Sequence, residues 1–398
     1  MRQRRIYPWV ICLMLLLSFG SCIKEEALNM EADIVGIQAE EDIFLLNPVI
    51  TNNQVTVYLQ PSIHDLTKLN MKFDLTPGAS IELLQDSLQM QAGEQDVNKV
   101  IIDQLLKNGV YYKVISQDKQ FEKNYLIKLV KTDGGFVPTE YGFEDVSIDK
   151  DEKYTVFFNK IDGEDFYNWG SGNPSFSLTL SFGGGVKEPE SYPTKTTADA
   201  HSGGKAALLE TKLTGSFGAM FKKPIAAGNL FIGSFDTGPV LTDPLSATQF
   251  GLPFNQIPLA LEGYYKYTAG ANVTDENLKP VNMKDSCDIY AVFYNRKKLM
   301  ASEPDPKKRV SYLTGHNILT DPSIVAIARL ENGGATAGNN FVKFVLPFKY
   351  STKVTESDVT NLDYSIAIVM SSSKYGDNFI GAVGSKLIVD DLKIVTQK

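Results

Sequence analysis

The chain has 398 residues, of which 43% are hydrophobic and 22% are charged, and its formal net charge is −8. This length predicts two or three domains, because a single hydrophobic core stops growing near roughly 250–300 residues. The acidic balance argues against nucleic acid as a partner, since affinity for phosphate backbones comes from clustered Lys and Arg, and basic runs such as residues 307–309 are short.

The first 26 residues predict a secretory signal followed by a lipid anchor. Three arginines precede an apolar run at residues 9–17, which is too short to span a bilayer once it is cleaved. Two small residues then precede Cys22, an order that resembles the lipobox of bacterial lipoproteins and implies acylation of Cys22. Removal of the signal, residues 1–21, takes away three arginines and no acidic residue, so the formal charge becomes −11.

The tether, residues 22–29, carries the sequence Lys-Glu-Glu at 24–26. This triplet resembles the export signal of surface lipoproteins in Bacteroidetes, which implies an outer-membrane protein exposed on the cell surface. The alternative is a solvated, charged start to a linker. No later apolar run reaches about 18 residues, so lipid is the only predicted membrane contact. Cys287 has no partner in the mature chain, and we expect no disulfide.

Residues 30–132 alternate apolar and polar side chains in short runs, which is typical of half-buried strands. Helical spacing at 97–105, with a glycine at 109, predicts one short helix. Residues 110–116 and 125–130 flank a polar turn and predict a closing hairpin. Together these elements predict an immunoglobulin-like (Ig-like) β-sandwich.

Residues 133–139 contain two glycines and a proline without periodicity, and they predict a linker. Residues 140–398 then contain many short strands, no convincing long helix and glycine-rich turns, which favours a jelly-roll β-sandwich. We therefore expect an all-β chain. The strands are predicted at 175–182, 229–235, 289–294, 324–330, 341–348, 364–370 and 387–395.

Five segments of the second domain carry a family resemblance: 203–211, 224–231, 250–254, 263–267 and 389–392. In this order they resemble the putative carbohydrate metabolism domain family. The resemblance implies a galactose-binding-like jelly roll on a surface lipoprotein, and it transfers no catalytic residue.

The usual enzyme motifs for nucleophilic, metal-dependent and phosphate chemistry are missing, so the sequence favours binding over catalysis. Sugar recognition needs aromatic faces and planar polar groups. Trp169 and Tyr167 lie in a polar, glycine-punctuated segment, where Trp169 is either a platform or a space-filling plug. Tyr264 and Lys266 share one face of a predicted strand, with Tyr265 and Tyr267 on the other. These four residues, Trp169, Tyr167, Tyr264 and Lys266, are the predicted ligand-binding set.

Two carboxylate pairs carry alternative hypotheses. Glu210 and Glu262 are the candidate pair if the protein hydrolyses glycosides, a reaction that needs two carboxyl groups about 5–9.5 Å apart. Glu144 and Asp390 lie at the predicted first and last strands, which commonly neighbour each other, so they are the candidate ligands of a structural calcium ion. The alternative is that these two acids cap strand ends.

The sequence therefore predicts a lipid-anchored outer-membrane protein that binds oligo- or polysaccharide without cleaving it. A glycoside hydrolase is the second hypothesis. An adhesion or assembly subunit that binds another outer-membrane protein is the third.

Overall fold

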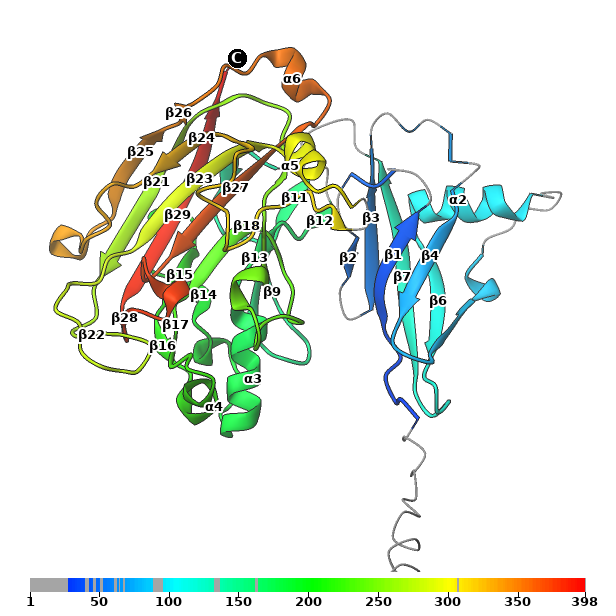
Figure 1. Cartoon of the computed structure of the whole chain (residues 1–398), viewed down its shortest axis with the longest axis horizontal. Helices are drawn as coiled ribbons and strands as arrows, with labels where there is room; N and C mark the ends of the chain where they lie inside the picture. Colours follow the sequence, from blue (N-terminus) through cyan, green and yellow to red (C-terminus); the bar gives the residue numbers. More distant parts are fainter. Residues whose placement is uncertain are drawn as a thin grey trace, which may run out of the picture. The chain divides into compact units, whose positions relative to one another are not determined.

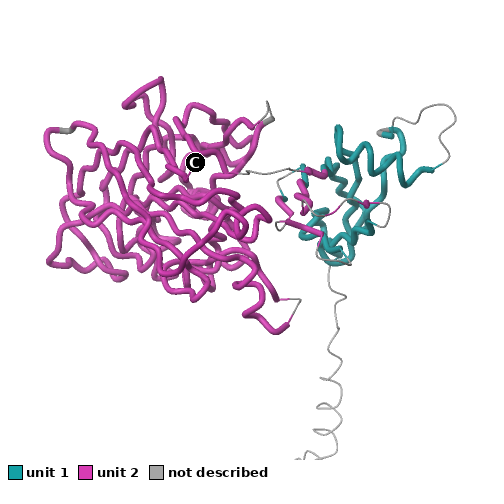
Figure 2. Tube along the Cα trace, turned by 90° about the horizontal axis from the view of Figure 1, so that it is seen from above, with its two compact units in different colours: residues 1–40, 50–55, 67–128 teal, residues 41–49, 56–66, 129–398 magenta. Residues whose placement is uncertain are grey.

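The structure is a computed structural model that describes residues 28–39, 43–45, 48–50, 53–60, 63, 65–66, 69–88, 96–131, 137–161, 164–305 and 308–397. The predicted signal, Cys22 and most of the tether lie outside these residues. The chain divides into two compact units, formed by residues 1–40, 50–55 and 67–128 and by residues 41–49, 56–66 and 129–398 (Figure 2). None of the described helices is long and apolar enough to cross a membrane.

The N-terminal strands form a five-stranded sheet with the order β2-β3-β7-β6-β5 and a two-stranded sheet β1-β4 (Figure 1). The elements are β1 (Ile34–Ala39), β2 (Val49–Ile50), β3 (Gln54–Leu59), β4 (Met71–Leu75), β5 (Ser80–Leu83), η1 (Gln85–Ser87), α2 (Val97–Lys107), β6 (Val110–Ile115) and β7 (Glu122–Lys131). Helix α2 begins at Asp96, whose side chain accepts a hydrogen bond from the Lys99 amide. The predicted helix and hairpin are confirmed, and the Ig-like assignment stays a prediction.

Two large sheets form the C-terminal region. The eight-stranded sheet has the order β13-β18-β27-β23-β24-β26, with β19 beside β18 and β20 beside β27; the six-stranded sheet has the order β14-β15-β29-β21-β25, with β8 beside β29. The strands of the first sheet are β13 (Trp169–Gly170), β18 (Asn229–Phe235), β19 (Thr248–Phe250), β20 (Leu252–Pro253), β23 (Asp288–Asn295), β24 (Ile324–Arg329), β26 (Lys349–Tyr350) and β27 (Tyr364–Ser371). Those of the second are β8 (Glu140–Tyr141), β14 (Thr194–Thr197), β15 (Ala206–Glu210), β21 (Pro258–Thr268), β25 (Val342–Pro347) and β29 (Lys386–Thr396).

Smaller elements connect the two sheets. The short strand pairs are β9 (Val146–Ile148) with β10 (Thr155–Phe157), β11 (Asn159–Ile161) with β12 (Glu164–Phe166), β16 (Lys212–Leu213) with β17 (Ile225–Ala226), and β22 (Val273–Thr274) with β28 (Gly381–Ala382). The helices are α3 (Asn173–Gly183), η2 (Pro189–Ser191), α4 (Gly215–Met220), η3 (Pro244–Ser246), α5 (Arg296–Ser302), η5 (Ala337–Asn339), α6 (Glu356–Thr360) and η6 (Gly376–Asn378).

The eight-stranded sheet is buried on both faces. Leu230 and Ile232 of β18 belong to the main core, together with Leu261 and Val389 from the six-stranded sheet. Phe231, which points to the opposite face of β18, belongs to a second core on the outer face of the sheet. The all-β class and the sandwich architecture are therefore confirmed, with one sheet that needs a cover on each side.

One predicted strand is wrong. Residues 175–182 form most of helix α3, although apolar and polar residues alternate there. Pro174 lies in the first turn of the helix, and Gly184 ends it with a φ of 70°. A short run of alternating residues is compatible with both a strand and a helix, so the flanking proline and glycine are the residues that indicate a helix here. Helix α3, with eleven residues, is therefore an element that the strand prediction replaced.

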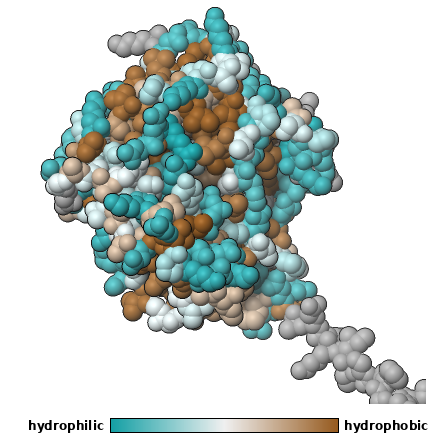
Figure 3. Space-filling view, turned by 60° about the vertical axis from the view of Figure 1, so that its left-hand side comes forward, coloured by the Kyte–Doolittle hydropathy of each residue, from teal (hydrophilic) through white to brown (hydrophobic). Residues whose placement is uncertain are grey.

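Strand β25 is the edge of the six-stranded sheet. From Lys343 onward its side chains alternate, with Phe344 and Leu346 buried and Lys343 and Val345 exposed. The side of the molecule that carries β25 shows hydrophobic patches between hydrophilic residues (Figure 3). The neighbouring Lys343 approaches Glu262 of β21 to 3.6 Å, and such a charged pair discourages pairing of the edge with another strand.

Gly233 is required where β18 meets β19. Its φ is 139°, and a Cβ atom there would lie 2.0 Å from the carbonyl oxygen of Gln249. We expect Gly233→Ala to lower the free energy of unfolding by roughly 1–3 kcal/mol, because both the φ angle and the contact are strained. Gly183→Ala is the matched control, since nothing lies within 4 Å of its Cβ position. Equal melting temperatures for the two variants would contradict this account.

Candidate functional site

Trp169 packs inside the sandwich instead of facing solvent. The residue is 7% exposed, and its ring lies against Tyr141 and Phe143, with centroids 5.1 and 5.5 Å away. The indole Nε1 donates a hydrogen bond to the Asn159 side-chain oxygen at 3.1 Å. The indole therefore offers no ring face to a sugar, and its role is to fill space. Tyr167 is 45% exposed and packs on Phe158.

The predicted faces of β21 are correct. Tyr265 and Tyr267 are buried in the main core, and Tyr264 and Lys266 lie on the other face. The Tyr264 ring stacks on His201 with centroids 3.5 Å apart, and Lys266 Nζ lies 2.7 and 2.6 Å from the two carboxylate oxygens of Asp199. A ligand at this place would have to replace these contacts, so the pair is a weak candidate site.

As predicted, the first and last strands of this domain are neighbours, because Tyr141 of β8 pairs with Leu392 of β29. Glu144 and Asp390 hold the two ends of one loop. Glu144 Oε1 accepts hydrogen bonds from the amides of Gly204 and Lys205 at 2.6 and 3.1 Å.

Asp390 is placed in the same way at the other end of this loop. Its Oδ2 atom accepts from the amides of His201 and Ser202 at 2.8 and 3.1 Å. Burial raises the pKa of Asp390, and these amides oppose the shift. The carboxylate oxygens of Glu144 and Asp390 accept hydrogen bonds from different amides, and this arrangement does not suit two ligands of one cation. Among the described residues, no group of three or more acidic, His or Cys side chains could hold a metal. The calcium site stays a prediction without geometric support.

The structure keeps Glu210 and Glu262 apart. Glu210 pairs in register with Lys386 of β29, and Glu262 with Lys393 of the same strand. Seven residues of strand correspond to roughly 20 Å, which exceeds the separation of glycosidase carboxylates. Burial opposes ionisation of Glu210, but the surrounding lysines, Lys195 first, hold its pKa below the usual value. This pair cannot act together on one glycosidic bond.

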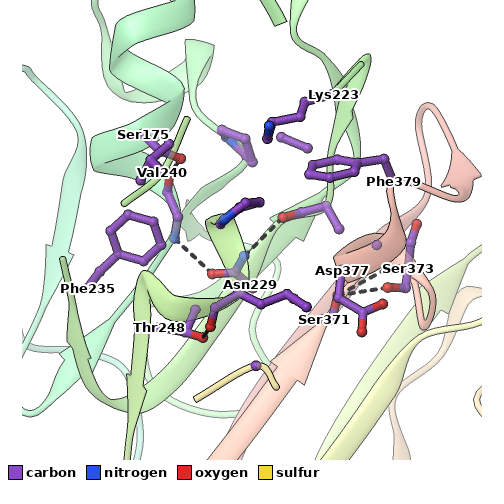
Figure 4. Close-up of a pocket in the computed structure, with 18 of the residues that line it drawn as sticks. Ser175, Lys223, Asn229, Phe235, Val240, Thr248, Ser371, Ser373, Asp377 and Phe379 are labelled. Carbon is purple, nitrogen blue, oxygen red and sulfur yellow. Dashed lines mark hydrogen bonds between the residues drawn. The ribbon is translucent and has the colours of Figure 1, made fainter. Parts of the chain in front are cut away.

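A pocket of about 350 Å³ lies against the outer face of the eight-stranded sheet, under α3 and α4. Further walls come from residues 235–250, the turn at 315–320 and the turn at 373–379. Figure 4 shows the pocket with residues from these walls, among them Ser175, Phe235, Lys223 and Phe379. None of the residues predicted from the sequence lines it.

The floor of this pocket consists of two rows across the sheet. The polar row is Asn229, Ser371 and Asp288, which pair in register on β18, β27 and β23. The apolar row, two residues further along each strand, is Phe231, Val369 and Tyr290, and it ends at Arg329 of β24. Neighbouring strands lie about 4.8 Å apart, so each row presents side chains at that spacing.

The walls are rich in aromatic and aliphatic side chains. In Figure 4, Phe235 and Val240 lie on one side of Asn229, and Ser371, Ser373 and Asp377 lie on the other. Aromatic faces beside a few polar groups are typical of small-molecule sites. The lining aromatic residues are Phe176, Phe217, Phe221, Phe231, Phe235, Phe250, Tyr290 and Phe379.

An ion pair anchors the polar end of the floor. Arg329 donates from Nε and Nη2 to the two carboxylate oxygens of Asp288, at 3.1 and 2.5 Å, and its guanidinium lies 5.3 Å from the Tyr290 ring centre. Burial raises the pKa of Asp288, and Arg329 opposes this shift. Lys374 and Asp377 also line this end and act electrostatically on Asp288.

Sequence reasoning missed this pocket for two reasons. One wall is α3, which was interpreted as a strand. The floor depends on the register of β18, β27 and β23, which are far apart in the sequence. The strands themselves were predicted, and their alternate residues Asn229 and Phe231 could have been flagged as a second buried face.

Arg329→Met should leave the buried Asp288 carboxylate unpaired. We expect a loss of roughly 2–3 kcal/mol in the free energy of unfolding, because a lone buried charge is costly and Arg329 is itself partly exposed. In this variant the folded-state pKa of Asp288 lies above its unfolded value, so stability is lost as pH rises through the folded pKa.

Chemical denaturation at pH 5 and pH 8 measures this effect, and the deficit relative to wild type should be larger at pH 8. The double variant Asp288→Asn/Arg329→Met is the control, and its deficit should not increase from pH 5 to pH 8, because it has no carboxyl group at position 288 to ionise. A deficit of Arg329→Met that stays constant between pH 5 and pH 8 would show that Asp288 does not depend on Arg329.

The model of the family described as putative carbohydrate metabolism domain matches residues 142–395. A crystal structure of a putative glycoside hydrolase from Bacteroides thetaiotaomicron VPI-5482 is 35% identical, covers 94% of this chain and 99% of its own, and has a TM-score of 0.76. A second, of a putative glycoside hydrolase from Bacteroides vulgatus ATCC 8482, is 37% identical, covers 65% of this chain and 98% of its own, and has a TM-score of 0.58. No curated protein matches the chain. The chain belongs to the putative carbohydrate metabolism domain family.

Proposed function

We propose that this chain is a lipid-anchored protein of the outer-membrane surface that binds oligosaccharide in the pocket over the eight-stranded sheet. The observation that carries the proposal is the pocket itself, where the polar row Asn229, Ser371 and Asp288 lies beside the buried rings of Phe231 and Tyr290. The ring of Phe379, which is partly exposed and lines the same pocket, is one that a sugar can contact. Hydroxyl groups of a sugar pair with amide, hydroxyl and carboxylate groups, and its C–H face packs on rings. Membership of a carbohydrate-related family supports the same ligand class.

Binding without cleavage is favoured by the state of Asp288. Both of its oxygens accept hydrogen bonds from Arg329, so neither is presented to a leaving group as a proton donor. A general acid in glycoside hydrolysis must deliver a proton to the glycosidic oxygen. Asp288 with Arg329 is instead suited to fixing the position of sugar hydroxyls.

Hydrolysis at the same place is the second candidate. Asp288 and Asp377 both line the pocket, and Asp377 adds to the rise of the Asp288 pKa, so two carboxyl groups share one site. The two similar crystal structures carry the name putative glycoside hydrolase. In this alternative Asp288 is the acid and the exposed Asp377 is the second carboxylate.

A panel of oligosaccharides separates the two candidates. The protein is expressed without residues 1–21 and with Cys22→Ser, and binding is measured by calorimetry while released reducing ends are assayed. We expect binding without release, about tenfold or more weaker in Ser371→Leu, because the larger side chain fills the polar row and leaves hydroxyls unpaired.

Tyr264→Ala, on the other sheet, is the matched control and should bind as wild type does. Release of reducing ends that is lost in Asp377→Asn would favour hydrolysis. Absence of any binding across the panel would overturn both candidates.

Lipid anchoring has its own test in the native host. We expect the full chain in the outer-membrane fraction with an acyl label, and surface exposure is measured by accessibility to protease in intact cells. Cys22→Ser should abolish the label and should release the protein from the membrane, because several acyl chains are needed for durable anchoring. Outer-membrane retention of Cys22→Ser with no acyl label on the wild type would contradict the proposed anchor.

A further inference from the structure

The pocket has two chemically different ends. Along β18, the polar row begins at Asn229, and Phe235 lies six residues further on, which is about 20 Å in a strand. The end beyond Phe231 is enclosed by Phe235, Val240 and Phe250. The two sides are visible in Figure 4, with Phe235 and Val240 opposite Ser371 and Asp377.

The apolar end is a poor match for a sugar ring. Beside Phe235, Thr248 also lines the pocket, but its hydroxyl group already donates to the Leu245 carbonyl oxygen at 3.3 Å. A pyranose placed between Phe235, Val240 and Phe250 would therefore bury most of its hydroxyl groups without partners, at a cost of about 1–3 kcal/mol each. An alkyl or acyl chain in the same place would gain about 0.8 kcal/mol for each buried methylene. The two ends of the pocket therefore select different parts of one ligand.

The rim of the pocket also carries exposed apolar side chains. Leu241 is 40% exposed, and Phe221 is also exposed, and both line the pocket. Next to them Phe182 of α3, also exposed, stacks on Phe217 of α4 with centroids 4.7 Å apart. Exposed apolar residues around an opening are typical of surfaces that receive apolar ligands.

We propose that the ligand of this pocket is an amphiphilic glycoside, a sugar head joined to an alkyl or acyl chain. The head lies over Asn229, Ser371 and Asp288, and the chain runs past Phe231 toward Phe235 and Val240. This inference rests on the proposed carbohydrate binding and adds the apolar part of the ligand to it.

Alkyl glycosides of increasing chain length test the inference. Methyl, butyl and hexyl β-glucosides and β-galactosides are titrated by calorimetry below their micellar concentrations. We expect affinity to rise about fourfold per methylene, which is the factor that 0.8 kcal/mol gives, until the pocket is filled. An affinity that does not change with chain length would overturn the inference and leave the proposed sugar binding intact.

Free alcohols of the same chain length separate the two claims. Hexanol should bind much more weakly than hexyl glucoside or hexyl galactoside, because it lacks the head. Equal affinity of hexanol and both hexyl glycosides would overturn the proposed function, since the sugar would then contribute nothing.

Two variants test where the alkyl chain of the ligand lies. Leu241→Asp places a charge at the exposed apolar rim, and Val240→Thr adds a hydroxyl group at nearly constant volume. Both should weaken hexyl glycosides about tenfold and leave methyl glycosides unchanged, with melting temperature as the folding check. Tyr264→Ala is the matched control. Unchanged binding of hexyl glycosides in both variants would place the alkyl chain elsewhere and overturn the inference.

Discussion

The eight-stranded sheet of the C-terminal domain must be covered on both faces, and the rest of the domain depends on this constraint. Strands β23 and β27 are buried along almost their whole length. The six-stranded sheet covers one face, and the other is covered by α3, α4 and irregular segments. Helices and loops match a pleated surface less closely than a second sheet does, and the space that remains is the pocket.

The same constraint explains why polar residues at the floor are paired. Asp288 is buried, and a carboxylate in such a place is tolerated only with a partner. Arg329 supplies it from the neighbouring strand β24, and Tyr290, which pairs in register with Arg329, supports the guanidinium. The ion pair thus holds Asp288 in place. Asn229 Oδ1 accepts from the Gly172 amide at 2.8 Å and Ser371 Oγ donates to the Ser373 carbonyl oxygen at 2.9 Å, and both side chains remain partly exposed, with capacity for a further hydrogen bond to a ligand.

Most strands of this domain could be predicted because a strand leaves its signature in consecutive residues, as at 229–235 and 364–370. The helix α3 could not be recognised from alternation, since only Pro174 and Gly184 distinguish it from a strand. Trp169 was ambiguous because its burial is decided by β13, a two-residue strand that pairs with β18 sixty residues away. The pocket required register between distant strands, which a single sequence does not contain.

Whether Asp288 serves as an anchor or an acid depends on two opposing effects. Burial raises its pKa and favours a proton, while Arg329 takes both oxygens and favours the charge. The hydrogen bonds to Asp288 also raise the pKa of Arg329. Separating the two side chains therefore costs more free energy than the loss of one hydrogen bond. To donate a proton, Asp288 would first have to leave this pair inside a largely apolar pocket. The geometry therefore favours recognition over proton transfer.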